Sequence, residues 1–178
     1  MNIEFVNILD VDEELIELVR NWRNSKQVSQ YMYTNHSITK EEHQRWIKKL
    51  KTSDTGKAWI IKYDEKPIGL AQLSNIDYTN KTTEWGFYIA DKSIRGRGVG
   101  SASLYKLIKY VFDEMKFNKM RTILLENNIN AMKLYKKFGF KGEGKIEEKF
   151  NRNGKEINVI LMGLIKDEWK NRKIIQNF

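Results

Sequence analysis

Residues 95–100 read Arg95-Gly96-Arg97-Gly98-Val99-Gly100, and they directly precede a long amphipathic segment. The three glycines expose successive backbone N–H groups and let a ligand approach the chain closely. At the start of a helix, such N–H groups and the positive end of the helix dipole bind anions. The two arginines add positive charge where a pyrophosphate would lie. This stretch therefore predicts an anion cradle at a helix N-terminus, against the alternative of an ordinary glycine-rich turn.

Two better-known phosphate-binding loops do not fit this stretch. The dinucleotide motif GxGxxG requires an acidic residue on a second strand about 20 residues further on, and none is placed there. The Walker loop requires Gly-Lys-Ser or Gly-Lys-Thr, which is missing after Gly100.

A second candidate stretch, residues 126–140, reads ENNINAMKLYKKFGF. Asn128 and Tyr135 are two helical turns apart, so they share one face of the expected helix. Asn128 could hold an amide-bearing cofactor arm, and Tyr135 could supply a phenol proton. The alternative is that Tyr135 only packs on an amphipathic helix.

Hydrophobic periodicity, capping patterns and turn residues predict the elements of the whole chain. Strands are expected at residues 2–8, 57–63, 67–76, 82–90, 121–126, 140–150 and 155–164, and helices at 11–24, 39–53, 99–116 and 128–138. The sequence NRNG at 151–154 predicts a hairpin turn between the last two strands. This order predicts an α/β layered sheet with mixed strand directions in one domain that spans residues 1–178.

The composition excludes several classes of chemistry. The chain has no cysteine, which excludes disulfides, thiolate metal sites and a cysteine acyl-enzyme. It has two histidines, and no other ligand type clusters around them at metal spacing, so we expect no metal site. The longest apolar run is about seven residues, too short to cross a bilayer. The acidic N-terminus does not resemble a signal peptide. We therefore expect a cytoplasmic protein with no membrane partner.

The net charge of +9 indicates either a polyanionic partner or a solvated basic surface. A nucleotide cofactor with several phosphates would also use such charge. A non-enzymatic module that binds nucleic acid is a further alternative. However, the basic residues are spread along the chain and no nucleic-acid-binding motif is present, so we expect no nucleic-acid partner.

Taken together, the two stretches resemble the GNAT superfamily of N-acetyltransferases, whose signature residues here are Arg95, Gly98, Gly100, Asn128, Ala131, Leu134, Tyr135, Gly139 and Phe140. The resemblance covers essentially the whole chain. It implies a mixed, mostly antiparallel seven-stranded sheet flanked by about four helices. It also implies that acetyl-coenzyme A is the acetyl donor and a small-molecule amine the acceptor.

The resemblance assigns cofactor roles residue by residue. The backbone amides of Arg95, Gly96, Arg97, Gly98, Val99 and Gly100 would bind the pyrophosphate. Asn128 would contact the pantetheine arm, and the backbones of Tyr88 and Ile89 would pair with it. Tyr135 would protonate the departing thiolate.

The family transfers the acetyl group directly, which agrees with the absence of cysteine. The amine must first lose a proton, to a base or through water. Glu84, at the start of strand 82–90, stands where many family members place a base, although a glutamate at a strand end is often merely exposed. A backbone N–H of the same strand would polarise the thioester oxygen.

The N-terminal half should select the acceptor. Its aromatic, arginine and histidine residues resemble the sugar-nucleotide branch of the family, which acetylates the 4-amino group of a UDP-linked 4-amino-4,6-dideoxy hexosamine in pseudaminic acid biosynthesis. On this resemblance Arg23, His43 and Tyr88 would bind the acceptor. Trp22 and Trp46 could instead be core residues of two amphipathic helices. Protein N-termini, such as the alanine of a ribosomal protein, and polyamines are the alternative acceptors. We also expect that an exposed strand of the C-terminal hairpin could pair two subunits as a homodimer.

Overall fold

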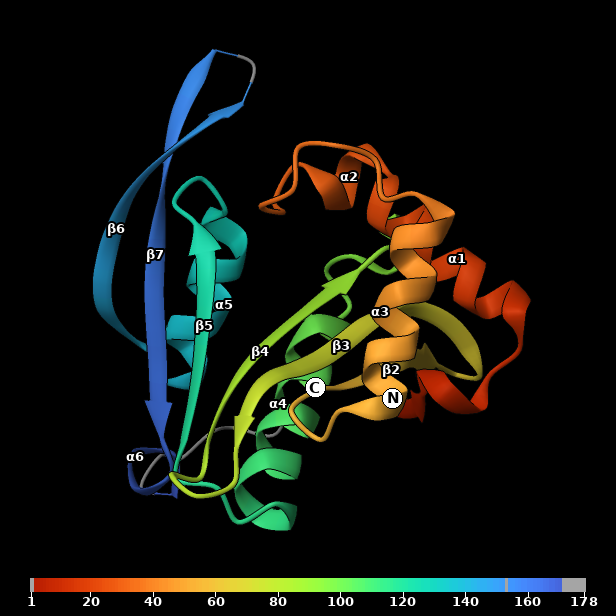
Figure 1. The fold of residues 1–178 in the computed structure, drawn as a ribbon. Helices are drawn as coiled ribbons and strands as arrows, with labels where there is room; N and C mark the ends of the chain where they lie inside the picture. The colour runs from red at the N-terminus through yellow and green to blue at the C-terminus, as the bar shows by residue number, and fades with distance from the viewer. Residues whose placement is uncertain (1, 153, 171–178) are drawn as a thin grey trace.

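The computed structural model describes residues 2–152 and 154–170. Seven strands of these residues form one sheet in the order β1-β2-β3-β4-β5-β7-β6 (Figure 1). Neighbouring strands are antiparallel except β4 and β5, which are parallel. The strands are β1 (Ile3–Asn7), β2 (Lys57–Tyr63), β3 (Lys66–Asp77), β4 (Thr82–Ile89), β5 (Lys119–Leu125), β6 (Lys141–Arg152) and β7 (Lys155–Ile165). This confirms the predicted mixed, mostly antiparallel sheet.

Helices connect the strands on both faces of the sheet. The α-helices are α1 (Glu13–Asn24), α2 (Lys26–Ser29), α3 (Lys40–Thr52), α4 (Val99–Lys109), α5 (Ile129–Phe138) and α6 (Lys166–Lys170). Two short 3₁₀ turns, η1 (Ile8–Asp10) and η2 (Lys92–Ile94), precede α1 and α4. The four predicted helices are confirmed. The sequence did not predict α2 and α6, because four or five residues are too few to show a helical period.

The predicted capping box at the start of α3 is present. The Glu42 N–H donates to Thr39 Oγ1 at 3.2 Å, and the Thr39 N–H donates to Glu42 Oε2 at 2.8 Å. These two bonds satisfy N–H groups that a helix start would otherwise leave without partners. They fix the residue at which the chain turns from the preceding connection into α3.

The long helix predicted at 99–116 changes character before its end. It is α-helical to Lys109 and continues as a π-helical turn, η3 (Tyr110–Glu114), in which the Met115 N–H donates to Tyr110 O at 2.9 Å. Val111 and Phe112 are consecutive residues of this turn, and both are fully buried. The apolar pattern alone could not distinguish this wider turn from an α-helix.

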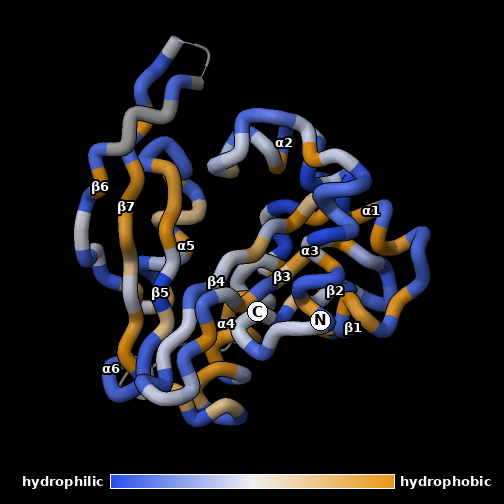
Figure 2. Tube along the Cα trace, in the orientation of Figure 1, coloured by the Kyte–Doolittle hydropathy of each residue, from blue (hydrophilic) through white to orange (hydrophobic). Residues whose placement is uncertain are grey.

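Apolar side chains fill both faces of the sheet. One cluster lies between the sheet and α4 and α5, and it includes Leu104, Phe112 and Phe138. Another cluster lies between the sheet and α1 and α3, and it includes Val19 and Ile60. Figure 2 shows hydrophobic colouring along β5 and β7 and on parts of α1 and α4, while the connection that carries α2 is largely hydrophilic.

The two parallel strands of the sheet stay together for only a short distance. Thr82–Glu84 of β4 pair with Lys119–Arg121 of β5, and the pairing then ends. Beyond that point β4 continues beside β3, and β5 continues beside β7. Figure 1 shows the two strands diverging. We call the diverging segments, Trp85–Ile89 and Thr122–Leu125, the fork.

The C-terminal strands form the predicted hairpin, with β6 at the edge of the sheet. At its turn, the Gly154 N–H donates to Asn151 Oδ1 at 3.0 Å, and Gly154 has a φ of 78°. Asn153, in the middle of the NRNG signal, lies outside the described residues. The predicted pairing of two subunits through this hairpin stays a prediction.

Candidate active site

The loop before α4 has the backbone conformation that an anion cradle requires. Gly96 has a φ of 80° and Gly98 a φ of 77°, and residues with a Cβ rarely adopt this backbone conformation. Gly98 is the N-cap of α4, and among the described residues no side chain caps this helix. The first N–H groups of a helix have no partner within the helix. They are therefore placed to donate to an anionic ligand.

The side chains of the cradle divide between solvent and core. Arg95 and Arg97 are exposed, whereas Val99 is buried in an apolar cluster and can offer only its backbone. A Cβ on Gly100 would lie 3.8 Å from Leu134 Cδ2 on α5. The cradle therefore adjoins the helix that carries the second predicted group of site residues.

The fork exposes a strand edge that leads away from the β4–β5 junction. The Ala90 N–H donates to Ile68 O on β3 at 2.7 Å. Hydrogen bonding alternates along an antiparallel pair, so Tyr88 also turns its backbone groups to β3, while Phe87 and Ile89 turn theirs to the open edge. Of the two predicted backbone contacts, Ile89 thus lies on this edge. Phe87, which the sequence analysis missed, joins it.

Asn128 is the N-cap of α5, and its Oδ1 accepts a hydrogen bond from the Ala131 N–H at 3.4 Å. This capping role occupies the amide oxygen and fixes the side chain at the end of the fork. The side-chain NH₂ is then the group that can donate to a bound ligand.

Tyr135 lies on the inner side of α5, 6% exposed. Its ring contacts Trp85 edge-on and Phe140 at a tilt. Burial raises the pKa of Tyr135, and the nearby Tyr33 phenol raises this pKa further. The phenol therefore keeps its proton at neutral pH and can act as a donor. The indole N–H of Trp85 is also buried, with no partner among the described residues.

Glu84 ends the paired part of β4, opposite Arg121 of β5. Its Oε2 accepts a hydrogen bond from Asn75 Nδ2 at 3.0 Å. Glu84 and Tyr135 are thus both at the junction from which the fork opens, since Trp85 follows Glu84 and contacts Tyr135. The sequence analysis missed Asn75, because no local pattern linked it to Glu84.

The structure brings two of the predicted acceptor residues together. Tyr88 directs its hydroxyl towards Val19 O on α1, at 3.5 Å. Burial raises the pKa of Tyr88, and the Arg23 charge opposes this rise, so the guanidinium is near the phenol. Arg23 also donates to Thr34 Oγ1 in the connection between α2 and α3.

His43, the third predicted acceptor residue, lies on α3, near Glu17 and Arg20 of α1, and is 6% exposed. Its ring stacks on Trp46 with centroids 5.2 Å apart. Burial lowers the pKa of His43, so the imidazole is neutral at pH 7. Its Nε2 has no partner among the described residues. The side chain therefore offers very little surface to a ligand in this conformation.

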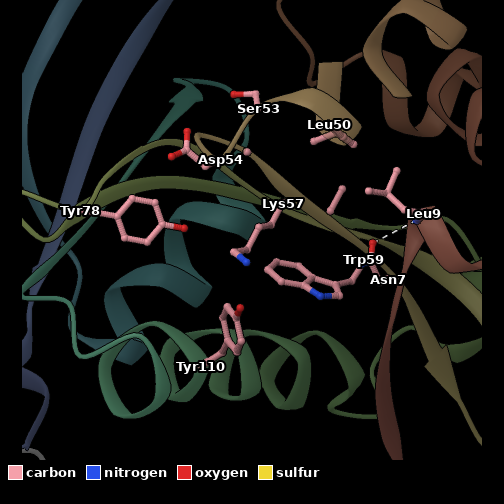
Figure 3. A pocket seen from close by; sticks show the side chains of 11 residues that line it. Asn7, Leu9, Leu50, Ser53, Asp54, Lys57, Trp59, Tyr78 and Tyr110 are labelled. Carbon is pink, nitrogen blue, oxygen red and sulfur yellow. Dashed lines mark hydrogen bonds between the residues drawn. The ribbon is translucent and has the colours of Figure 1, made fainter. Parts of the chain in front are cut away.

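Two cavities lie near the C-terminal end of α3. A cavity of about 210 Å³ is lined by Trp46, Lys49, Leu50, Ser53, Thr55, Gly56, Gln72, Leu73, Ser74 and Asn75. A second, of about 330 Å³, adjoins it, and Figure 3 shows Lys57, Tyr78 and Tyr110 pointing into it beside Trp59. None of the predicted site residues lines either cavity. The first one reaches Glu84 through the Asn75 hydrogen bond.

Within residues 2–152 and 154–170, no group of three or more His, Asp or Glu side chains is arranged to hold a metal ion. In the same part of the chain, no helix has the length and apolar character needed to cross a membrane.

An anion cradle at a helix start, an open strand edge and a buried phenol are features that an acyl donor with a phosphorylated carrier requires of its site. Residues 11–161 match the sequence profile described as an acetyltransferase (GNAT) domain. The acetyltransferase PseH of Campylobacter jejuni is 33% identical over 138 residues, which are 78% of this chain and 84% of that one.

Solved structures agree with this match. Campylobacter jejuni N-acetyltransferase PseH, in complex with acetyl coenzyme A, has a TM-score of 0.68 at 25% identity and covers 93% of this chain and 99% of its own. Vibrio cholerae spermidine N-acetyltransferase, in complex with CoA and spermine, has a TM-score of 0.84 at 20% identity, covering 95% of this chain and 98% of its own. At that identity the likeness shows the fold alone.

The chain belongs to the GNAT family of acetyltransferases. It is an N-acetyltransferase that uses acetyl-coenzyme A. This membership sets aside the alternative of a non-enzymatic nucleic-acid-binding module.

Proposed function

We propose that this enzyme acetylates the 4-amino group of a UDP-linked 4-amino-4,6-dideoxy hexosamine, a step of pseudaminic acid biosynthesis. Identity of 33% to a PseH acetyltransferase over most of both chains supports this acceptor. The match to a spermidine N-acetyltransferase of Vibrio cholerae is 23% identical over 88% of this chain.

One structural observation carries the choice between these acceptors. The 210 Å³ cavity beside the Asn75–Glu84 pair contains Lys49, and none of the described residues that line it is Asp or Glu. A polyamine is a polycation, and the lining itself offers it no carboxylate: Glu84 lies behind Asn75, and Asp54 lines the adjoining cavity. A nucleotide diphosphate would gain a charge-assisted contact with Lys49. The Trp46 ring and the polar groups of Gln72 and Ser74 suit a nucleoside.

The donor side of the proposal uses the cradle and the fork. Backbone N–H groups of residues 95–100 bind the pyrophosphate, helped by the charges of Arg95 and Arg97. The open edge at Phe87 and Ile89 and the amide of Asn128 hold the pantetheine arm. Acetyl-coenzyme A supplies the reactive thioester when it is bound.

The transfer step uses two titratable side chains. Glu84 takes a proton from the acceptor ammonium, directly or through water, so that the free amine attacks the thioester carbonyl. The C–N bond forms, the C–S bond breaks, and Tyr135 gives its proton to the thiolate. The new amide nitrogen gives up its second proton to the Tyr135 phenolate, directly or through water, and Glu84 releases its proton to solvent. The raised pKa of Tyr135 suits a proton donor that must remain protonated until the thiolate forms. Arg23 and Tyr88 contact the acceptor, and His43 packs behind them.

The test measures coenzyme A release with three acceptors: the UDP-amino sugar, spermidine and a peptide with N-terminal alanine. We expect the highest kcat/KM with the UDP-amino sugar. Lys49→Glu should raise the KM for this sugar about tenfold, because hydrogen bonds to charged groups contribute about 1.5–3 kcal/mol. Lys48→Glu is the matched control, since Lys48 is exposed on the same helix and does not line the cavity. Preference for spermidine or the peptide in the unmodified enzyme would overturn the acceptor assignment.

The predicted single-domain extent, the homodimer and the cytoplasmic location remain proposals. The mass in solution, measured by light scattering, tests the homodimer, and a monomer would remove it.

A further inference from the structure

The connection between α1 and α3 is held firmly to α1. We call this connection, residues 25–39, the strap. Asn24 Nδ2 donates to Ile38 O at 3.0 Å, and the Ile38 N–H donates back to Asn24 Oδ1 at 2.7 Å. Arg20 Nη1 also donates to Ile38 O, at 2.9 Å. Arg23 donates to Thr34. The strap is thus positioned by the helix that also carries the proposed acceptor residue Arg23.

The strap contacts the ends of both strands that form the fork. Gln27 donates through Nε2 to Ala90 O, directly after β4. Tyr33 packs against a buried apolar cluster formed by Leu125, the last residue of β5, and by Ile157 and Val159 of β7. Figure 1 shows the segment after α2 extending towards the far end of β5. The strap therefore links two strands that have stopped pairing with each other.

Leu125 is hydrogen-bonded to the start of α5, the helix that carries the proposed acid Tyr135. Its carbonyl accepts a hydrogen bond from the Asn128 N–H at 2.9 Å, and Asn128 is the N-cap of α5. A displacement of Leu125 would therefore move the start of the helix that carries Tyr135. In addition, the Tyr33 hydroxyl is shielded from solvent, and it is close enough to act electrostatically on Tyr135.

We propose that Tyr33 is a positioning residue for acetyl transfer: by packing on the cluster that contains Leu125, it fixes Tyr135 relative to the acceptor-binding helices. The contact joins the half of the enzyme that holds the acceptor to the half that protonates the leaving group. This inference rests on the proposed function, because it assumes that Tyr135 is the proton donor.

The effect expected from such a contact is larger on kcat than on donor binding. Tyr33→Ala should lower kcat about tenfold or more, since a misplacement of about 1 Å can slow a reaction substantially. The KM for acetyl-coenzyme A should rise by a smaller factor than kcat falls, because the cradle lies on α4 and, of the proposed donor-binding residues, only Asn128 stands at the start of α5. Tyr33→Phe keeps the packing ring and should restore most of kcat. Tyr31→Ala, in the same strap, is the matched control and should leave both constants unchanged.

A double-mutant cycle with Tyr135→Phe decides whether Tyr33 acts through Tyr135. Coenzyme A release is measured for both single variants and the double variant, well below each melting temperature. We expect Tyr33→Ala to lower kcat by a much smaller factor in the Tyr135→Phe background than in the unmodified enzyme. Tyr33→Leu replaces Tyr33→Ala if the alanine variant does not fold.

The outcomes separate the two proposals. Suppose that Tyr135→Phe lowers kcat. If Tyr33→Ala then lowers kcat by the same factor in the Tyr135→Phe background as in the unmodified enzyme, or has no effect on kcat by itself, the positioning role is wrong and the proposed acid stands. If Tyr33→Ala mainly raises the KM for acetyl-coenzyme A, the positioning role is also wrong. If Tyr135→Phe leaves kcat unchanged, the acid assignment fails, and the inference about Tyr33 fails with it.

Discussion

Tyr135 lies edge-on against Trp85, with ring centroids 4.8 Å apart and an angle of 67° between the planes. Trp85 is the first residue of β4 beyond the segment that pairs with β5. The proposed acid is therefore fixed by an aromatic contact at the point where the fork opens. Edge-on pairs of this kind contribute about 0.5–1.5 kcal/mol beyond the burial of their area.

Tyr135→Phe separates this packing from the chemistry. The ring stays in place, so we expect the melting temperature to stay within a few degrees of the unmodified enzyme. Loss of the phenol proton should lower kcat about 10²- to 10⁴-fold, the usual contribution of general acid catalysis. Coenzyme A release under saturating substrates measures it. Tyr105→Phe on α4 serves as the control, and an unchanged kcat for Tyr135→Phe would contradict the acid role.

Glu84→Gln tests the proposed base. The amide keeps a hydrogen-bond acceptor for Asn75 but cannot take a proton, so kcat at neutral pH should fall about 10²-fold. The loss should shrink as the pH rises, because more of the acceptor amine is then already unprotonated. A pH–rate profile of both forms measures this. Parallel profiles with equal rates would show that Glu84 is only a surface carboxylate, and Asn75→Ala, which frees Glu84, should have the smaller effect.

Alanine at either of two glycines of the cradle, Gly98 or Gly100, should raise the KM for acetyl-coenzyme A, but the two substitutions should differ in their effect on the free energy of unfolding. Gly98 has a φ of 77°, so Gly98→Ala should cost about 1–2 kcal/mol of unfolding free energy. Gly100 is helical and has room for a Cβ, so Gly100→Ala should be neutral or gain up to about 1 kcal/mol. Both should raise the KM for acetyl-coenzyme A. Thermal melts and steady-state kinetics check this, and a normal KM in both variants would place the pyrophosphate elsewhere.

His43 should make the fold sensitive to mildly acidic pH. Burial lowers its pKa in the folded state below 6.5, so the unfolded chain binds this proton more readily. Its contribution to stability is complete above about pH 6.5 and is lost as the pH falls through 6.5 towards the lower folded pKa. The melting temperature should drop between about pH 7.5 and about pH 5.5, above the range in which carboxylates titrate.

His43→Leu should flatten this dependence, whereas His36→Asn, at the exposed histidine, should retain it. Glu17 and Arg20 also act on the His43 charge, in opposite directions. If the melting temperature of His43→Leu falls with pH as much as that of the unmodified enzyme, the pH dependence belongs to other groups.

Local patterns predicted most of the fold, because each long element buries one regular face. Leu104, Leu107 and Ile108 follow a helical stripe, and all three are fully buried on α4. The cradle and the Asn128–Tyr135 pair could also be found from local patterns, because each lies within a single continuous segment. His43 shares a helix face with the buried Ile47, and this spacing was the available sign that His43 would be buried too.

Relations between distant segments could not be predicted in this way. No local signal shows that β4 and β5 pair at Thr82–Glu84 and then part, although this separation creates the open edge at Phe87 and Ile89. The packing of Tyr33 against the cluster that contains Leu125 likewise joins two halves of the chain. Such contacts depend on tertiary packing, and an irregular connection such as the strap carries no hydrophobic period.

The most direct test of the proposed acceptor is a competition for acetyl transfer. The enzyme, acetyl-coenzyme A and equal concentrations of the UDP-4-amino-4,6-dideoxy hexosamine, spermidine and the alanine peptide are combined, and the products are identified by mass spectrometry. We predict that the UDP-linked sugar gains one acetyl group on its 4-amino nitrogen while the other two amines stay largely unmodified. Acetylation of spermidine or the peptide, with the sugar unchanged, would contradict it.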